Sequence, residues 1–337
     1  MKRRVYLRAL AVAGTTAVAG CQSMPTDSGP GDDGPGTGGD GTNSASDGGQ
    51  TDEEATAEHL RSAVGALNRV GYRLSELESQ LESDPTQVDL DTEETLAVVE
   101  AARSDLDAAA ETATDDQLAT IETLRSLTTV LASMTRLVAL LSTVDTEGRL
   151  ESVQTDVEKG DYDAALSAIR DGNETARQAD EYVTTATEAA DSMDPDRLDA
   201  VDAVAYDELE PALTAASRLV DGLLAVTRGY ESVLLGREDL ATARTAIENE
   251  SFDAAETALA DGRAHFEAAD ESFASVGDDA PEVLAQYVTR ADCQTDHLVL
   301  ATDHFQAAVE DARRGAVSAA RTHRDDAEAE LQRVDDC

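Results

Sequence analysis

The stretch IETLRSLTTVLASMTRLVALL, residues 121–141, decides the fold class of this chain. Its large apolar side chains recur every three or four positions, at Ile121, Leu124, Leu127, Leu131, Met134, Val138 and Leu141. That spacing places them on one face of an α-helix, because a helix turns once in about 3.6 residues. A second stretch repeats the pattern at Leu209, Leu213, Ala216, Val220 and Leu223. The sequence therefore predicts amphipathic helices that bury their apolar faces against one another.

The same spacing extends on both sides of this stretch, and no run of alternating β-branched residues bounded by turn residues interrupts it. We therefore predict an all-α domain over residues 52–337, built as an elongated antiparallel helical bundle or an irregular α-solenoid. It is either one domain or two fused bundles that meet near residue 205. The predicted helices span residues 54–83, 91–113, 115–145, 147–159, 161–192, 207–235, 237–249, 251–277, 281–313 and 315–335.

Two parts of this domain align at an offset of 90 residues, VEKGDYDAA at 157–165 and IENESFDAA at 247–255. In each part a helix ends, Asp161 or Ser251 caps the next helix, and Tyr162 or Phe252 enters at its start. The alignment predicts an internal repeat of about 90 residues, with Gly160 in the first hairpin turn.

The stretch GDYDAAL at 160–166 resembles the start of the second helix in a tetratricopeptide repeat, which reads G-D-Y-x-x-A. The resemblance implies a turn between two antiparallel helices. Tetratricopeptide repeats have a period of about 34 residues, and their first-helix Trp, Leu-Gly pair and terminal Pro are missing here. We therefore expect longer antiparallel helices, of about 25 to 45 residues, in place of a tetratricopeptide array.

Residues 1–20 have the layout of an export signal, with positive charges before a weakly apolar run that is shorter than the about 20 residues of a membrane-spanning helix. Arg3 and Arg4, followed by Val-Tyr-Leu, resemble a twin-arginine signal, and Val-Ala-Gly before Cys21 resembles a lipobox. The leader is thus similar to those of twin-arginine-exported haloarchaeal lipoproteins. This resemblance implies folding before export, cleavage before Cys21 and a lipid on the Cys21 thiol.

Residues 21–51 read as a tether between the lipid and the domain. Gly, Asp, Ser, Thr and Pro dominate this stretch, which therefore lacks the apolar surface needed to order itself. No later stretch reaches 18 consecutive apolar residues. We predict that the lipid on Cys21 is the only membrane contact and holds the exported domain at the outer face of the cell membrane.

The charge composition excludes some partners. Asp and Glu number 70 against 26 Lys and Arg, a formal charge of −44, so the clustered cations that bind nucleic acid are missing. Asp supplies 40 of the acids and only two of the cations are Lys. This balance is typical of extreme halophiles, in which molar salt screens repulsion between acidic groups.

Cys293 and Cys337 are the remaining thiols once Cys21 carries a lipid. Gly315 lies 22 residues from each, so a turn at Arg314 and Gly315 would bring the two thiols level. An oxidising exterior then favours a disulfide between them. The alternative is two unrelated cysteines, since a disulfide requires Cα atoms within about 7 Å.

Candidates for catalysis or metal binding are few. His297 and His304 lie seven residues apart and would share a helix face, with Asp303 beside the second. Neither H-E-x-x-H nor E-x-x-H occurs, and acids near histidine are common in so acidic a chain, so we expect no metal or cofactor. The chain also lacks G-x-S-x-G and a strand-to-helix phosphate loop, and we predict that it is not an enzyme.

These features favour a lipid-anchored helical scaffold or protein-interaction lipoprotein. We expect it to bind a protein partner at the cell surface and to be attached to the membrane by the lipid on Cys21. The alternative is a ligand- or cation-binding lipoprotein that serves a transporter. A concave pocket lined by converging polar groups would favour the alternative, whereas a solid core would favour the scaffold.

Overall fold

The structure is a computed structural model that describes residues 52–83, 91–142, 146–203, 206–276 and 282–337. Arg3, Arg4 and Cys21, with the rest of the predicted leader and tether, lie outside the described residues. The described residues form ten α-helices and no strand, which confirms the predicted all-α fold. The helices are α1 Asp52–Ser83, α2 Thr92–Ala110, α3 Asp115–Ser142, α4 Thr146–Lys159, α5 Tyr162–Asp191, α6 Pro195–Asp199, α7 Tyr206–Glu248, α8 Phe252–Ala274, α9 Glu282–Arg313 and α10 Val317–Val334.

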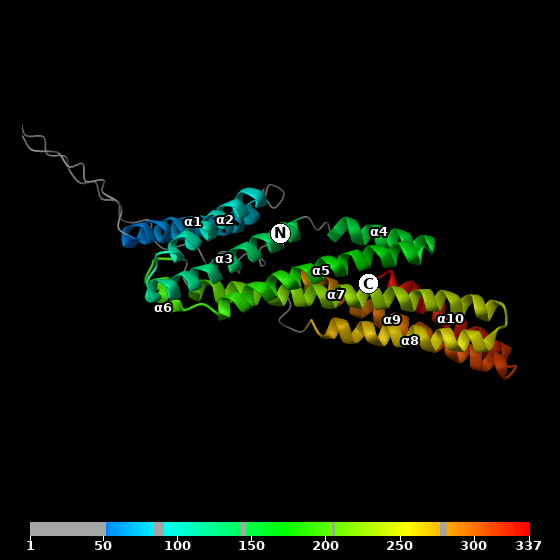
Figure 1. Ribbon diagram of the computed structural model, residues 1–337. Helices are drawn as coiled ribbons and strands as arrows, with labels where there is room; N and C mark the ends of the chain where they lie inside the picture. The colour runs from blue at the N-terminus through cyan, green and yellow to red at the C-terminus, as the bar shows by residue number, and fades with distance from the viewer. Residues whose placement is uncertain (1–51, 84–90, 143–145, 204–205, 277–281) are drawn as a thin grey trace, which may run out of the picture.

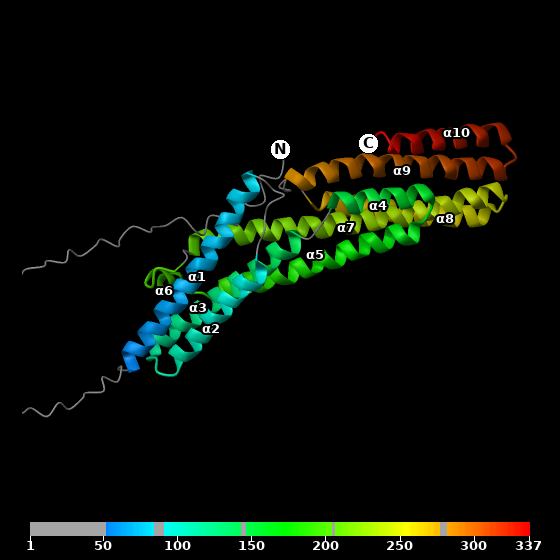
Figure 2. The same cartoon turned by 90° about the horizontal axis from the view of Figure 1, so that it is seen from above.

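The helices form an elongated body with a separate group of helices at each end (Figures 1 and 2). Helices α1, α2, α3 and α6 gather at one end, and α8, α9 and α10 gather at the other. Helices α5 and α7 run side by side between the two groups. Each end buries its own set of apolar side chains, which we name the N-terminal core and the C-terminal core.

The N-terminal core is formed by α1, α2, α3 and α6 with the adjoining parts of α5 and α7. Its largest fully buried side chains are Leu67, Leu106, Ile121, Leu124, Leu127, Leu131, Leu137 and Leu198. Helix α3, which contains the stretch 121–141, is long and apolar enough to cross a membrane by length and composition alone. However, 61% of its most apolar window is buried in the structure. Packing against α1, α2 and α5 therefore accounts for its hydropathy.

The C-terminal core combines the second part of α7 with α8, α9 and α10, and it contains Phe266, Phe273 and Phe305. Two of these rings rest on glycines of α7. A Cβ atom on Gly229 would lie 2.4 Å from the Phe273 ring, and one on Gly236 would lie 2.5 Å from the Phe266 ring. The two glycines are seven residues apart, and so are the two phenylalanines. This equal spacing fixes the antiparallel register of α7 and α8. The missing side chains therefore allow aromatic rings to pack directly on the α7 backbone.

Helix α7 is one continuous helix of 43 residues, where we predicted two helices over 207–235 and 237–249. The predicted break falls at Gly236, and glycine inside a helix costs about 1 kcal/mol relative to alanine. In the structure, Gly236 accommodates the fully buried Phe266 ring, and that burial offsets the cost. Helix α7 contributes Leu224 to the N-terminal core and Val233 to the C-terminal core. The residues of α7 thus pass from the N-terminal core to the C-terminal core between Leu224 and Val233.

A third, smaller cluster includes Leu234 of α7, which directly follows Val233 of the C-terminal core. Helix α4 contributes Val153, α5 contributes Ala165, Leu166 and Ile169, and α7 contributes Leu234. This cluster attaches α4 to the long helices and continues the apolar seam between α5 and α7.

Four helix ends share one backbone pattern. Gly160, Asp202, Glu250 and Gly315 have positive φ angles of 76°, 51°, 55° and 77°. In each turn, the following N–H donates to the carbonyl five residues earlier, for example from Asp161 to Asp156 at 2.8 Å. This is the Schellman end of a helix, in which a left-handed residue lets the chain satisfy its last carbonyls. A glycine is favoured there because it adopts positive φ without steric cost.

The side-chain caps after these turns differ. The Asp161 carboxylate accepts a hydrogen bond from the Ala164 N–H at 3.1 Å, as predicted. Ser251 occupies the N-cap position of α8 as predicted, but its side chain makes no capping hydrogen bond, and its hydroxyl instead lies 3.5 Å from the Asn249 carbonyl oxygen. Short α6 was not predicted, although Asp194 caps it and Pro195 occupies its first turn.

Candidate functional site

A shallow acidic groove lies between α8 and α9, and we name it the α8–α9 groove. Its volume is about 550 Å³, and it is lined by Glu267, Asp270, Glu271, Thr295, Asp296, Val299 and Leu300. The four carboxylate side chains are exposed. Val299 and Leu300 add an apolar strip, and Leu300 is one of the few large apolar side chains exposed in the described structure. The groove therefore combines negative charge with apolar surface.

The charges of the α8–α9 groove are only partly balanced. Glu267 pairs with Arg263 at 2.9 Å, whereas Asp270, Glu271 and Asp296 form no ion pair with any described residue. Asp292, one helical turn before Asp296, is half-buried. Its burial raises its pKa, and the negative charges of Asp270 and Asp296 raise that pKa further. A cationic group placed in the groove would relieve this repulsion.

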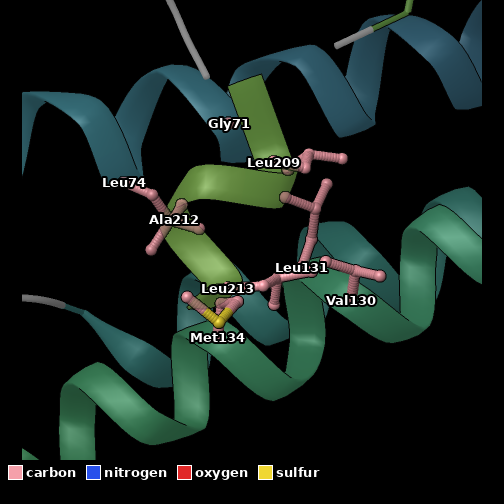
Figure 3. Close-up of a pocket in the computed structure, with 8 residues that line it drawn as sticks. All are labelled: Gly71, Leu74, Val130, Leu131, Met134, Leu209, Ala212 and Leu213. Atoms are coloured by element: carbon pink, nitrogen blue, oxygen red, sulfur yellow. The ribbon is translucent and has the colours of Figure 1, made fainter. Parts of the chain in front are cut away.

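A small apolar cavity lies in the N-terminal core (Figure 3). Its volume is about 20 Å³, and it is lined by Gly71, Leu74, Val130, Leu131, Met134, Leu209, Ala212 and Leu213 from α1, α3 and α7. That volume has room for about one water molecule, whereas small-molecule sites measure roughly 300–1,000 Å³. This cavity is therefore a packing defect of the core and offers no room for a ligand.

Cys293 of α9 and Cys337, at the end of the chain, lie at disulfide distance, with 2.01 Å between the Sγ atoms and 5.9 Å between the Cα atoms. The predicted pairing and the predicted turn at Gly315 are both confirmed by this geometry. His297 lies one turn after Cys293, and its Nδ1 is 2.8 Å from a carboxylate oxygen of Glu330 in α10. This hydrogen bond, helped by Arg333, lowers the pKa of the buried Glu330 carboxyl.

His297 and His304 each have a partner across the α9–α10 hairpin. The His304 ring stacks on His323 of α10 with 6.2 Å between the ring centroids. Asp303, which we placed beside His304, pairs with Arg263 of α8. Ligand atoms of His304, His323 and Asp326 all lie within 4.8 Å of one another. Sequence spacing missed this cluster, because nothing local indicates which α9 residue faces which α10 residue.

The remaining predicted site residues have structural roles. Gly160 forms a turn, Asp161 caps α5, and Tyr162 is half-buried at the start of that helix. Phe252 begins α8 and packs against the C-terminal core. The α8–α9 groove could not be identified in advance, because its acids are a few among the 70 of the chain.

Comparison with known protein families, with curated proteins and with solved structures finds no match. The groove and the histidine cluster are therefore interpreted from their own chemistry.

Proposed function

We propose that this chain is a lipid-anchored helical scaffold at the outer face of the membrane of an extreme halophile, and that it binds a protein partner through the α8–α9 groove. The leader motifs at Arg3, Arg4 and Cys21 support export and anchoring. The observation that carries the interaction is the groove, in which three unpaired carboxylates flank an apolar strip. The chain is not an enzyme and needs no cofactor for this role.

The groove matches a basic amphipathic helix of the partner. Such a helix would place Arg or Lys beside Asp270, Glu271 and Asp296 and apolar side chains on Val299 and Leu300. In molar salt, charges separated by more than about 3 Å are largely screened. Direct ion pairs and the apolar strip would therefore supply most of the affinity.

The architecture of the proposed scaffold is an irregular stack of helical hairpins with an internal repeat of about 90 residues. The shared Schellman turns at Gly160 and Glu250, which are 90 residues apart, support this repeat. The similar turn at Gly315 supports a third, shorter unit. In such a stack, each hairpin offers an exposed helix face for partners.

Charge reversal in the groove tests the interaction. The full chain serves as bait for host membrane extract in molar salt, beside a variant with Asp270→Lys, Glu271→Lys and Asp296→Lys. The matched control carries the same reversal on exposed acids of α5, Asp171→Lys, Glu174→Lys and Glu181→Lys. We expect the unmodified bait and the α5 variant to retain the same protein and the groove variant to lose it. Equal capture by all three baits would contradict the proposal.

The anchor has its own test. Cys21→Ser should release the folded protein into the medium, because the lipid is the only anchor that we infer. Cys293→Ser should leave it in the membrane fraction, and replacement of Arg3 and Arg4 by lysine should block export. Retention of the Cys21→Ser variant in the membrane fraction would contradict the anchoring.

Adaptation to salt is tested by thermal unfolding. The unfolding temperature should rise from dilute buffer to molar KCl, because salt screens the repulsion that a net charge of −44 creates. An unfolding temperature that does not depend on salt would contradict this assignment.

A second candidate function is capture of a small cation for a transporter. The volume of the groove, about 550 Å³, and its unpaired carboxylates favour this reading. Calorimetric titration of the full chain with an organic dication in molar KCl separates the two functions. Saturable binding that the groove reversal abolishes and the α5 reversal spares would support cation capture.

A further inference from the structure

The α9–α10 hairpin brings two histidines and an aspartate together. His304 comes from α9, whereas His323 and Asp326 lie three residues apart on one face of α10. One ligand atom from each residue lies within 4.8 Å of the other two. In a tetrahedral zinc site, bond lengths of about 2.0–2.2 Å set neighbouring ligand atoms about 3.3 Å apart. Rotation of these partly exposed side chains can bring their ligand atoms from within 4.8 Å to the shorter distance that zinc requires.

The surroundings of His323 leave one ring nitrogen available. Its Nε2 lies 3.6 Å from a carboxylate oxygen of Asp311, and Arg314 holds that aspartate at 2.7 Å. A carboxylate beside Nε2 favours the proton on Nε2 and leaves the lone pair on Nδ1. Nδ1 is buried and has no hydrogen-bond partner among the described residues. A buried polar atom without a partner requires an explanation, and an ion is one.

We propose that His304, His323 and Asp326 bind a divalent transition-metal ion, with Zn²⁺ as the ion that this ligand set suits best. Two imidazoles and one carboxylate are borderline ligands that zinc binds with a fourth position open, whereas Ca²⁺ and Mg²⁺ prefer oxygen ligands alone. Asp311 is the outer carboxylate that orients His323. The site uses no thiol, so it is compatible with the pairing of Cys293 and Cys337. It is independent of the anchor and of the α8–α9 groove.

Zinc titration of the full chain tests this site. Calorimetry in molar KCl, which suppresses loose binding to the acidic surface, should show one zinc ion per chain. His304→Ala and His323→Ala should each weaken binding by at least the roughly tenfold to hundredfold cost of losing an outer partner. Zinc should also raise the unfolding temperature of the full chain and leave that of the double histidine variant unchanged.

Neighbouring residues provide matched controls. Asp326→Asn should weaken zinc binding, whereas Asp325→Asn, one residue earlier and also exposed, should not. His297→Ala removes a histidine from the same hairpin and should leave the affinity unchanged. Circular dichroism confirms that each variant keeps its helices. Equal zinc affinity of the full chain and the His323→Ala variant would overturn the proposal, as would displacement of the zinc by an equal concentration of Mg²⁺.

Discussion

The two cores of this molecule solve the same packing problem with different side chains. The N-terminal core fills the space between helices with leucines, and it leaves a cavity of about 20 Å³. The C-terminal core contains Phe266, Phe273 and Phe305, and its last two helices are joined at Cys293 and Cys337. The chain has four phenylalanines, and all of them lie in α8 and α9. Phenylalanine rings are thus confined to the end where glycines of α7 make room for them.

This difference shows how one long helix can serve two kinds of packing. In the N-terminal core, α7 presents Leu213 and Val220 to its neighbours. In the C-terminal core, it presents Gly229 and Gly236, and the neighbouring helix supplies the bulk. A small change of side-chain volume should change stability more where an aromatic ring packs on a backbone than where flexible leucines can adjust. The two ends should therefore respond differently to the same kind of substitution.

The largest expected difference comes from the crosslink. Cys337→Ser opens a loop of 44 residues and should lower the free energy of unfolding by about 4 kcal/mol, because the unfolded chain regains its freedom. Urea denaturation measures the loss, and hydrogen exchange should show faster opening of α10. Cys293→Ser should have the same effect. An unchanged urea midpoint in both variants would show that the pair does not stabilise the C-terminal core.

Substitution of glycine by alanine should change the free energy of unfolding in opposite directions at the two ends of the molecule. Gly229→Ala and Gly236→Ala each push a methyl group into a phenylalanine ring and should cost about 1–3 kcal/mol. Gly65→Ala in α1 meets no atom within 4 Å and should stabilise by about 0.5–1 kcal/mol. Chemical denaturation compares the three variants. Stabilisation by Gly229→Ala would mean that the Phe273 ring moves away freely.

The helix caps should show a smaller contrast. Asp161→Ala removes a capping hydrogen bond and should cost about 1 kcal/mol, whereas Ser251→Ala removes none and should change stability little. Thermal unfolding of the two variants under one salt condition measures the difference. Equal losses would indicate that the Ser251 hydroxyl caps α8 in solution.

The smallest expected difference between the two ends is the effect of one buried or hydrogen-bonded aspartate on stability, and it depends on pH. The pKa of Asp105 is lowered, chiefly by the Ser62 hydroxyl, so its ionised form stabilises the fold, and that stability is lost as the pH falls through the folded-state pKa. The pKa of Asp292 is raised above 3.8 by burial, so its ionised form destabilises the fold at neutral pH. Asp105→Asn should therefore lower the unfolding temperature at neutral pH and Asp292→Asn should raise it. Both differences should vanish well below pH 3.8, and effects of the same sign would contradict these assignments.

Helix positions were predictable from sequence because apolar spacing and capping residues are local signals. Predicted 54–83 and 281–313 differ from α1 and α9 by a few residues at most. The continuity of α7 through Gly236 was not predictable, because the benefit of the missing side chain lies in its contact with Phe266, thirty residues away. The pairing of Cys293 with Cys337 was predictable from equal spacing about one turn. The partner of His304 was not, because rotation of α10 about its axis decides which residue faces it.

Helix α7 also sets how the molecule melts. At about 1.5 Å per residue, it spans roughly 65 Å, and its two halves line different cores. Loss of either core would leave an apolar face of a still-folded helix in water, so partial melting is unfavourable. The two ends should therefore share one cooperative transition, with a calorimetric enthalpy equal to the van't Hoff enthalpy. An elongated body with separate cores would then behave thermodynamically as a single unit.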